Sequence, residues 1–378
     1  MTDRNAVHVL YGVPHSLYTG IVRSYLRTQG IAYEERTPAH PVFATQIAPV
    51  IQRVIVPVLV TPQGEVIQDS RDIIDHLERR GVPYPAYPTG PLQHILSTII
   101  QYYGTQSMLR HAMHYRWSYL HQQEYFLRAA FSTGSTATQA ETVMARMQSY
   151  LPHLGVTEQT KPLIEQSYAK LLDILDQHFA IYPYLFGGRP SVADYGLIGP
   201  LFAHLGRDPI PCQIMQLRAP KVFRWVERML APGLDVPEYP GSQPEFLDQD
   251  QVPGTLEPLL AHIAEEIFPE LTDKLACLDT HIRSEQPADG TPVTAKPHQR
   301  HVGQVQTQFR GAHITAGVEP YLLYCLHKAD AVLAASSADQ QSRIRAFLQT
   351  HHLDQALPGD RGYGVARRDH LEVWTRDN

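Results

Sequence analysis

Two serines stand where helices are predicted to begin, and such positions can bind a negatively charged group. Ser16 opens a segment whose apolar residues recur at helical spacing until Gly30, and Ser70 opens a shorter helix that ends near Arg79. The first turn of a helix offers free amides, the positive end of the helix dipole and here also a hydroxyl. The sequence therefore predicts two anion sites, unless both serines only cap their helices.

A proline interrupts an apolar, β-branched segment over residues 54–60. Because proline lacks the amide that a central strand needs, Pro57 either ends a strand, lies at a sheet edge or follows a cis peptide bond. A sheet edge or a cis Val56–Pro57 bond would turn the backbone of Val56 outward.

Alternating strand and helix patterns position these residues. Residues 7–11 and 31–35 are predicted strands on either side of the helix at 16–29, and a hairpin over 55–68 precedes the helix at Ser70. A strand–helix–strand unit forms a parallel pair with a right-handed crossover, and the hairpin adds an antiparallel pair. Residues 92–230 show helical periodicity without a convincing strand, including one long stretch from Pro91 to Glu124.

Together these features resemble the cytosolic glutathione transferase superfamily. The resemblance covers about residues 6–230 and is carried by Ser16-x-Tyr18, Val56–Pro57, Asp69–Ser70, the Gly187–Tyr195 segment with its Ser191/Asp194 capping-box spacing, and Pro220…Trp225…Arg228–Met229. It implies an α+β, thioredoxin-like, glutathione-binding domain over residues 5–82 and an all-α domain over 91–240. It also implies glutathione as cosubstrate and a homodimer.

The resemblance also assigns roles around the predicted sheet. The backbone at Val56–Pro57 would pair with the cysteinyl part of glutathione, Ser70 would hold the γ-glutamyl carboxylate, and Asp69 would lie near the glutamyl amine. Arg53 would bind the glycyl carboxylate, although superfamily members carry the basic residue directly before Val-Pro, whereas Val54–Ile55 intervene here. Arg53 could equally be a solvated surface charge.

Ser16 is the predicted catalytic residue, as in serine-type, bacterial-like members, and it precedes the basic Arg23 by seven residues. A free thiol has a pKa near ~8.5, so a hydroxyl donor and a helix N-terminus would favour the reactive thiolate. Tyr18 and Tyr11 are rivals, because other classes use a tyrosine near the first strand. Residues 1–211 contain no cysteine, which argues against thiol–disulfide chemistry of the cysteine type.

The electrophile would bind between the domains, against the aromatic and basic segment 108–117. Met108, His111 and Tyr115 share one helical face there by their three- and four-residue steps. The plainer interpretation is packing between domains. His111 and His114 lack a third ligand at a suitable spacing, so no metal site is predicted.

A C-terminal extension over residues 250–378 follows a proline-rich stretch. It contains an amphipathic stripe from Leu256 to Ile282, a hairpin around 302–315, and helices near 319–334 and 338–350 before an irregular tail. The fold class is thus a thioredoxin-like domain, an all-α domain and a mainly helical extension. The extension would pack on the helical domain, and it could cover the pocket and narrow substrate choice.

Composition limits the classes of function. The net charge of −6 argues against a nucleic-acid partner, no apolar run is long enough to span a membrane, and the N-terminus does not resemble a signal peptide. The three scattered cysteines fit a reducing, cytoplasmic compartment. We therefore expect a detoxifying glutathione transferase that joins the thiolate to an apolar or aromatic electrophile. The alternatives are a glutathione-dependent lyase or dehalogenase, and a non-catalytic binding or scaffold protein with the same fold.

Overall fold

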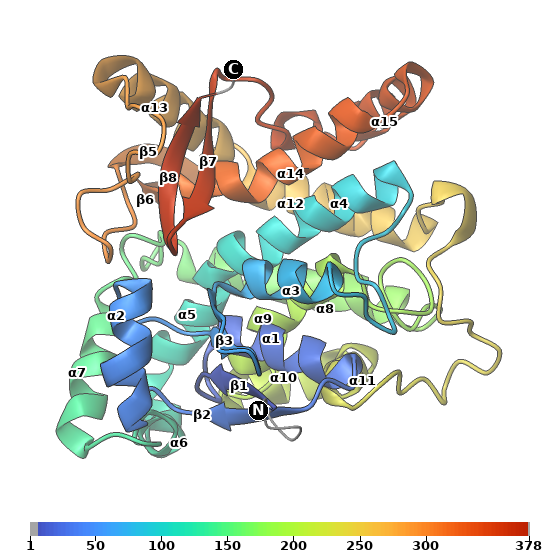
Figure 1. The fold of residues 1–378 in the computed structure, drawn as a ribbon. Coiled ribbons are helices and arrows are strands. Elements are labelled where there is room, and N and C mark those ends of the chain that lie inside the picture. Colours follow the sequence, from blue (N-terminus) through green and yellow to red (C-terminus); the bar gives the residue numbers. More distant parts are fainter. Residues whose placement is uncertain (1–6, 377–378) are drawn as a thin grey trace.

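The structure is a computed structural model that describes residues 7–376, and its N-terminal part is a mixed four-stranded sheet (Figure 1). The strands lie in the order β2–β1–β3–β4, with β1 parallel to β2 and antiparallel to β3. The elements of this domain are β1 (His8–Tyr11), α1 (Leu17–Thr28), β2 (Tyr33–Arg36), β3 (Val58–Val60), β4 (Val66–Gln68) and α3 (Ser70–Glu78). This is the predicted thioredoxin-like arrangement.

The connection between β2 and β3 contains two elements that were not predicted from the sequence. They are a π-helical turn, η1 (Phe43–Ile47), and a short helix, α2 (Ala48–Ile51). Phe43 and Ile51 pack with the β1–β3 face of the sheet. The predicted strand at 54–60 is shorter, since β3 begins only at Val58, after a cis Val56–Pro57 bond.

The next region is entirely helical, as expected. Its elements are α4 (Pro91–Tyr102), η2 (Tyr103–Ser107), α5 (Leu109–Ser118), α6 (Leu120–Phe131), α7 (Ala137–Gln148), α8 (Lys161–His178), α9 (Val192–Ala203), α10 (Pro209–Arg218) and α11 (Pro220–Leu230). The stretch predicted as one long helix from Pro91 to Glu124 is therefore broken, first by the π-helical turn η2 and again at Tyr119. The capping box of Ser191 and Asp194 is confirmed at the start of α9.

The extension adds helices and two antiparallel hairpins. Its elements are η3 (Asp248–Asp250), η4 (Gly254–Leu256), α12 (Glu257–Ile267), α13 (Glu270–Glu285), β5 (Gly303–Phe309), β6 (Ala312–Val318), α14 (Tyr321–Ala335), α15 (Ala338–Thr350), η5 (Asp354–Ala356), β7 (Tyr363–Arg368) and β8 (Leu371–Arg376). The amphipathic stripe forms two helices because Pro269 separates α12 from α13. The β5–β6 hairpin was predicted, whereas β7–β8 replaces the expected irregular tail.

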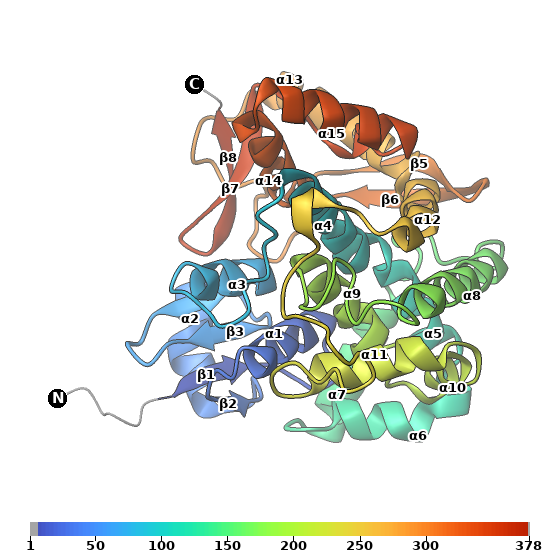
Figure 2. The same ribbon diagram turned by 90° about the vertical axis from the view of Figure 1, so that its right-hand side faces the viewer.

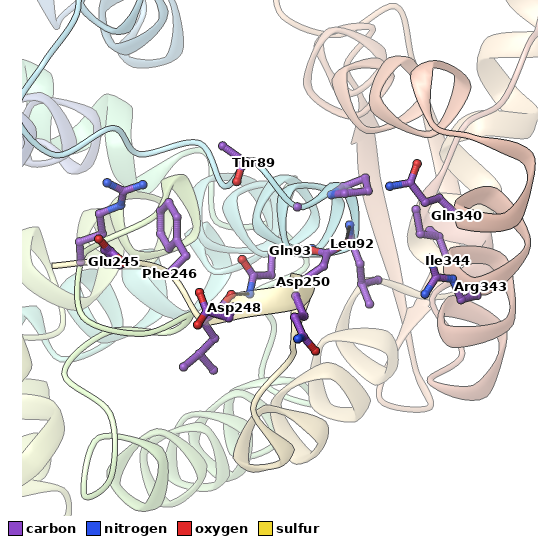
Figure 3. Close-up of a pocket in the computed structure, with 15 residues that line it drawn as sticks. Thr89, Leu92, Gln93, Glu245, Phe246, Asp248, Asp250, Gln340, Arg343 and Ile344 are labelled. Carbon is purple, nitrogen blue, oxygen red and sulfur yellow. Dashed lines mark hydrogen bonds between the residues drawn. The ribbon is translucent and has the colours of Figure 1, made fainter. Parts of the chain in front are cut away.

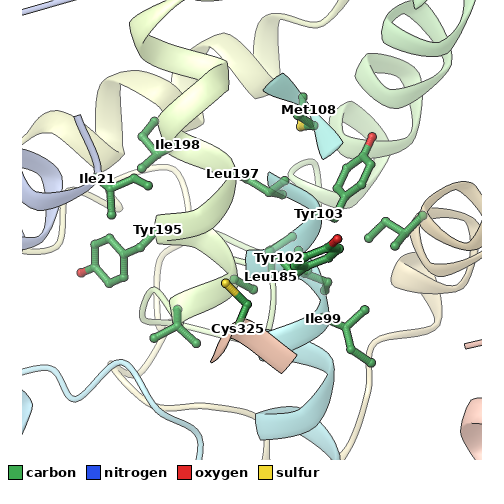
Figure 4. Packing of buried hydrophobic residues seen from close by; sticks show 14 of the residues in the cluster. Ile21, Ile99, Tyr102, Tyr103, Met108, Leu185, Tyr195, Leu197, Ile198 and Cys325 are labelled. Atoms are coloured by element: carbon green, nitrogen blue, oxygen red, sulfur yellow. The ribbon is translucent and has the colours of Figure 1, made fainter. Parts of the chain in front are cut away.

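The extension packs on both preceding regions. Figure 1 shows α14 beside α4, and Figure 2 shows the β7–β8 hairpin above α3. Cys325 of α14 reaches the core beside Tyr102 and Leu185 (Figure 4). One continuous apolar core runs from Leu10 to Trp374, so the domain boundaries drawn from the sequence stay predictions. Among residues 7–376, no helix has the length and apolar character needed to span a membrane.

Candidate functional site

Ser16 lies at the N-terminus of α1, as predicted. Its Oγ accepts a hydrogen bond from the Thr19 amide at 3.3 Å, and the side chain is half-buried. Because the hydroxyl is the acceptor in that bond, its own proton stays available for another acceptor. Arg23 is bound elsewhere, with its guanidinium 2.6 Å from the Glu35 carboxylate. The Ser16 hydroxyl can therefore donate a hydrogen bond to a ligand and still accept from the Thr19 amide.

The two rival tyrosines are held by other contacts. The Tyr18 hydroxyl donates to the Thr105 carbonyl at 3.0 Å, and burial raises the pKa of Tyr18 to about 12. Tyr11 is 2% exposed and packs against Phe43, with ring centroids 5.3 Å apart. Both tyrosines are therefore held by contacts within the protein, and the roles of Ser16, Tyr18 and Tyr11 at the sulfur stay predictions.

Asp69 and Ser70 form the start of α3. Asp69 caps the helix with a φ of 90°, and its carboxylate accepts from the Arg71 amide at 2.9 Å. Ser70 is 4% exposed, so the predicted carboxylate site at this helix N-terminus is covered. Val56 is half-buried and precedes β3. Two residues of the C-terminal extension contact Asp69, since Tyr321 of α14 donates to its carboxylate and Arg367 of β7 lies 3.1 Å from it.

Arg53 is buried under the β7–β8 hairpin. It is 3% exposed, and its guanidinium donates to Gln68 Oε1 at 2.9 Å and to the His370 carbonyl at 2.6 Å. It also lies 3.2 Å from the Glu372 carboxylate of β8. The alternative of a solvated surface charge is therefore wrong. Arg53 does bind a carboxylate, but in this structure the carboxylate belongs to the same chain.

Arg367 of β7 neutralises the two acidic residues at the start of α3. Its guanidinium lies 3.1 Å from Asp69 Oδ2 and 2.5 Å from Asp72 Oδ2. Two tyrosines of α14 complete the contact, since Tyr321 donates to Asp69 at 2.9 Å and Tyr324 donates to Asp72. The place predicted for the glutamyl amine thus holds a guanidinium.

These contacts give the neighbouring carboxyls different pKa values. Burial works to raise the pKa of Asp69, but Arg367 and the Arg71 amide outweigh it, so the pKa lies below its ordinary value. Burial and the neighbouring charge of Asp69 raise the pKa of Asp72 to about 6. Burial opposes the ionised form of Glu372 as well, yet Arg367 and Arg53 hold its pKa below normal. The cluster is a compact network of alternating charges.

The residues predicted to bind the electrophile are buried in the interior. Met108 and His111 are fully buried, and Tyr115 is 3% exposed. His111 Nε2 lies 2.9 Å from Ser167 Oγ and 3.6 Å from Glu266 of α12, and burial keeps its pKa well below normal. This face of α5 therefore contacts α8 and the extension.

Two further expectations concern metal and thiol chemistry. His114 pairs with Glu165 at 3.0 Å, and within residues 7–376 no group of three or more His, Cys, Asp or Glu side chains could hold a metal ion. The fold does bring a cysteine close to the site, since Cys325 lies one helical turn from Tyr321 on α14. Burial raises the pKa of the Cys325 thiol, which disfavours its reactive form.

A separate groove of about 700 Å³ lies at the N-terminus of α4, facing the 245–250 loop and α15 (Figure 3). Asp250 stands at its centre and accepts from the Leu92 amide at 2.7 Å and the Gln93 amide at 2.8 Å. None of the residues predicted to bind glutathione or the electrophile lines this groove. The carboxylate of Asp250 therefore caps the N-terminus of α4.

Sequence reasoning missed the extension residues that complete the site, chiefly Arg367, Glu372, Tyr321 and Tyr324. The only local signal for the first two was period-two alternation in Val365, Val373 and their neighbours, which indicates strands but no binding partner.

Comparison with known proteins supports the N-terminal assignment. Residues 10–83 match the family model of the glutathione S-transferase N-terminal domain. No curated protein matches the chain. The resemblance is thus confirmed for this domain, while the serine type and the bacterial-like subclass stay predictions.

Several solved structures resemble the chain at low identity. A GST-like protein from Pseudomonas syringae is 16% identical, with 61% of this chain and 69% of that chain covered and a TM-score of 0.40. A glutathione transferase from Phanerochaete chrysosporium is 15% identical, with 64% and 98% covered and a TM-score of 0.43. A Ceriporiopsis subvermispora glutathione S-transferase, solved in complex with glutathione, is 18% identical, with 59% and 96% covered and a TM-score of 0.41.

Proposed function

We propose that the protein binds glutathione on its N-terminal domain and presents the glutathione sulfur as a thiolate to an apolar or aromatic electrophile. The observation that carries this proposal is the charge pattern around Gln68. Its Oε1 accepts from Arg53 at 2.9 Å and from Arg367 at 3.1 Å, and Arg367 continues to Asp69. The carboxylate of Asp69, which binds a cation, and the guanidinium of Arg53, which binds a carboxylate, are thus connected through Gln68.

Glutathione carries matching charges, an α-ammonium with a carboxylate at one end and a second carboxylate at the other. Asp69 would take the ammonium, Ser70 with the α3 amides the adjoining carboxylate, and Arg53 the glycyl carboxylate. The chain's own Arg367 and Glu372 support this pairing, because they place a cation on Asp69 and a carboxylate on Arg53.

Ser16 would supply the chemistry at the sulfur. Its hydroxyl proton and the N-terminus of α1 favour the thiolate over the thiol. The thiolate attacks the electrophilic carbon, a carbon–sulfur bond forms, and the leaving group departs with its bonding electron pair. A lyase or dehalogenase would use the same thiolate, so the product distinguishes these activities.

The test is the ultraviolet absorbance of the thiolate, followed against pH in protein saturated with glutathione. We expect the thiol of bound glutathione to ionise at least one pH unit below the ~8.5 of a free thiol, and Ser16→Ala to abolish that shift. Ser337→Ala is the matched control, because Ser337 caps α15 on the exposed surface. A shift that persists in Ser16→Ala would contradict the role of Ser16.

A second candidate is a non-catalytic binding protein with the same fold. The burial of Met108, His111 and Tyr115 favours it, since these side chains form no open electrophile surface in this structure. That candidate predicts no retention on immobilised glutathione and no turnover of an activated aryl halide. The homodimer and the cytoplasmic location stay predictions, and light scattering would test the first.

A further inference from the structure

The tip of the β7–β8 hairpin presents a cation and a carboxylate side by side. Arg367 and Glu372 are directly opposite in the register of the hairpin, and their charged groups lie 3.3 Å apart. They are 10% and 11% exposed, because both side chains point into the N-terminal domain. The hairpin therefore carries a small zwitterion on the face that it docks.

This zwitterion occupies the groups proposed for glutathione. The Arg367 guanidinium forms ion pairs with Asp69 and Asp72, and the Glu372 carboxylate forms an ion pair with Arg53. Asp69 Oδ1 accepts from the Arg71 amide, and Oδ2 accepts from Tyr321 at 2.9 Å and from Arg367 at 3.1 Å, so an α-ammonium would need the position that the guanidinium holds. A glycyl carboxylate at Arg53 would likewise need the position of Glu372, because Arg53 also donates to Gln68 and to the His370 carbonyl. Hairpin docking and glutathione binding are therefore mutually exclusive.

The hairpin is not part of a larger sheet, because β7 and β8 pair only with each other as named strands. Segment 290–293 is joined to β8 by the Pro292–Val373 bridge and by backbone hydrogen bonds to Trp374 and Glu372, so release of the hairpin breaks these bonds or moves this segment with it. The connection from η5 to β7 contains Gly359 and Gly362, both with positive φ. Against release stands the burial of Val365, Val373 and Trp374, so the docked state is the stable one.

We propose that the β7–β8 hairpin is an exchangeable internal ligand that closes the glutathione site, an inference that rests on the proposed function. Glutathione binds only to the fraction of molecules in which the hairpin has left, and its apparent Kd is raised by the inverse of that fraction. An open fraction of about 1% would weaken binding about a hundredfold. The extension thus sets how much glutathione the protein needs.

The test compares glutathione titrations by calorimetry for the wild-type chain and two variants that reverse one charge on the same strand. Arg367→Glu places a negative group against Asp69 and Asp72 and should release the hairpin. Arg368→Glu is the matched control, since Arg368 faces outward and is half-exposed beside Asp289. We expect Arg367→Glu to bind glutathione at least tenfold more tightly than wild type, and Arg368→Glu to bind within twofold of wild type.

A second readout follows the hairpin itself. Trp374 of β8 is 2% exposed, so its fluorescence should shift to longer wavelength when glutathione displaces the hairpin from the wild-type chain. Trp374→Phe identifies its share of the emission beside Trp117 and Trp225. If Arg367→Glu does not show a cooperative melting transition, the isosteric Glu372→Gln replaces it, because it frees Arg53 without adding a charge.

The outcomes separate the two proposals. Equal affinity of wild type and Arg367→Glu would overturn the internal ligand and leave glutathione binding standing. If no folded variant binds glutathione, both the proposed function and the role of the hairpin as an internal ligand are overturned. Tight wild-type binding without a change in Trp374 emission would show that the docked hairpin and glutathione coexist, which also overturns the internal ligand.

Discussion

The guanidinium of Arg367 lies 3.1 Å from the carboxylate of Asp69, although 298 positions separate the two residues in the chain. This contact connects the last hairpin to the N-cap residue of α3, the helix that was predicted to bind glutathione. Asp72, Arg53 and Glu372 extend it into a buried network of ion pairs. Removing one partner from such a network destabilises the protein, because it leaves a buried charge uncompensated.

The pKa of Asp72 is expected to report the position of the hairpin. Burial raises this pKa to about 6 in the wild-type chain, while Arg367 lowers it in part. In Arg367→Glu a released hairpin returns solvent to the carboxyl, so its pKa should fall below the wild-type value. A hairpin that stays seated would instead raise the pKa, since the lowering guanidinium is gone. Carboxyl-carbon NMR titration, assigned with Asp72→Asn, distinguishes the two.

Acid should destabilise the protein through buried His178. Burial lowers its pKa to about 4, and the ring lies 2.8 Å from Thr255 Oγ1. The pKa of His178 in the folded protein lies below the unfolded value of ~6.5. The contribution of this residue to the free energy of unfolding is therefore complete above pH ~6.5 and is lost as the pH falls through about 4. At pH 5 the loss is about 2 kcal/mol.

Urea unfolding at pH 7 and pH 5 measures this loss. His178→Gln should lose less stability between the two pH values than wild type, whereas the exposed His121→Gln should behave as wild type. An unchanged difference in His178→Gln would contradict the assignment.

The buried capping box should be worth far more than the exposed one. The Asp194 carboxylate is fully buried and accepts from the Ser191 amide and hydroxyl, both at 2.9 Å, and from the Leu185 amide at 3.1 Å. Asp194→Ala leaves these donors without a partner and should cost about 4 kcal/mol of unfolding free energy. Ser337→Ala at the exposed box should cost about 1 kcal/mol. Similar costs by urea unfolding would refute this.

The crossing of η2 and α9 should tolerate no added side-chain atom. A Cβ at Gly104 would lie 2.5 Å from the Gly196 carbonyl oxygen, so the two backbones would have to separate. Gly104→Ala should lower the free energy of unfolding by about 3 kcal/mol. Gly254→Ala is the control, because nothing lies within 4 Å of that position. A small effect of Gly104→Ala in urea unfolding would mean that the crossing is looser than the structure shows.

Local patterns in the sequence were sufficient to predict the four strands of the N-terminal domain and its helices α1 and α3, but not η1 and α2. Period-two and helical spacing predicted the β1–α1–β2 unit, and Gly311 after Arg310 marked the turn of the β5–β6 hairpin. The β7–β8 turn gave no such signal, because Asp369 and His370 both adopt positive φ without a glycine. The π-helical turn η2 likewise keeps helical periodicity while it breaks the helix.

The site could be predicted only in part, because its second half comes from distant chain. Ser16, Val56, Asp69 and Ser70 lie in one domain and follow from short motifs. Arg367 and Glu372 are ordinary strand charges until the fold places them on Asp69 and Arg53. An ion pair between residues so far apart in the chain produces no pattern in the spacing of residues, so the sequence does not predict it.

The most direct test of the account is a crystal structure of the Arg367→Glu chain soaked with glutathione. We expect the tripeptide between Arg53 and Asp69, beside Val56, with its sulfur within hydrogen-bond reach of the Ser16 hydroxyl and the β7–β8 hairpin displaced. Density for a seated hairpin and no glutathione at these residues would contradict it.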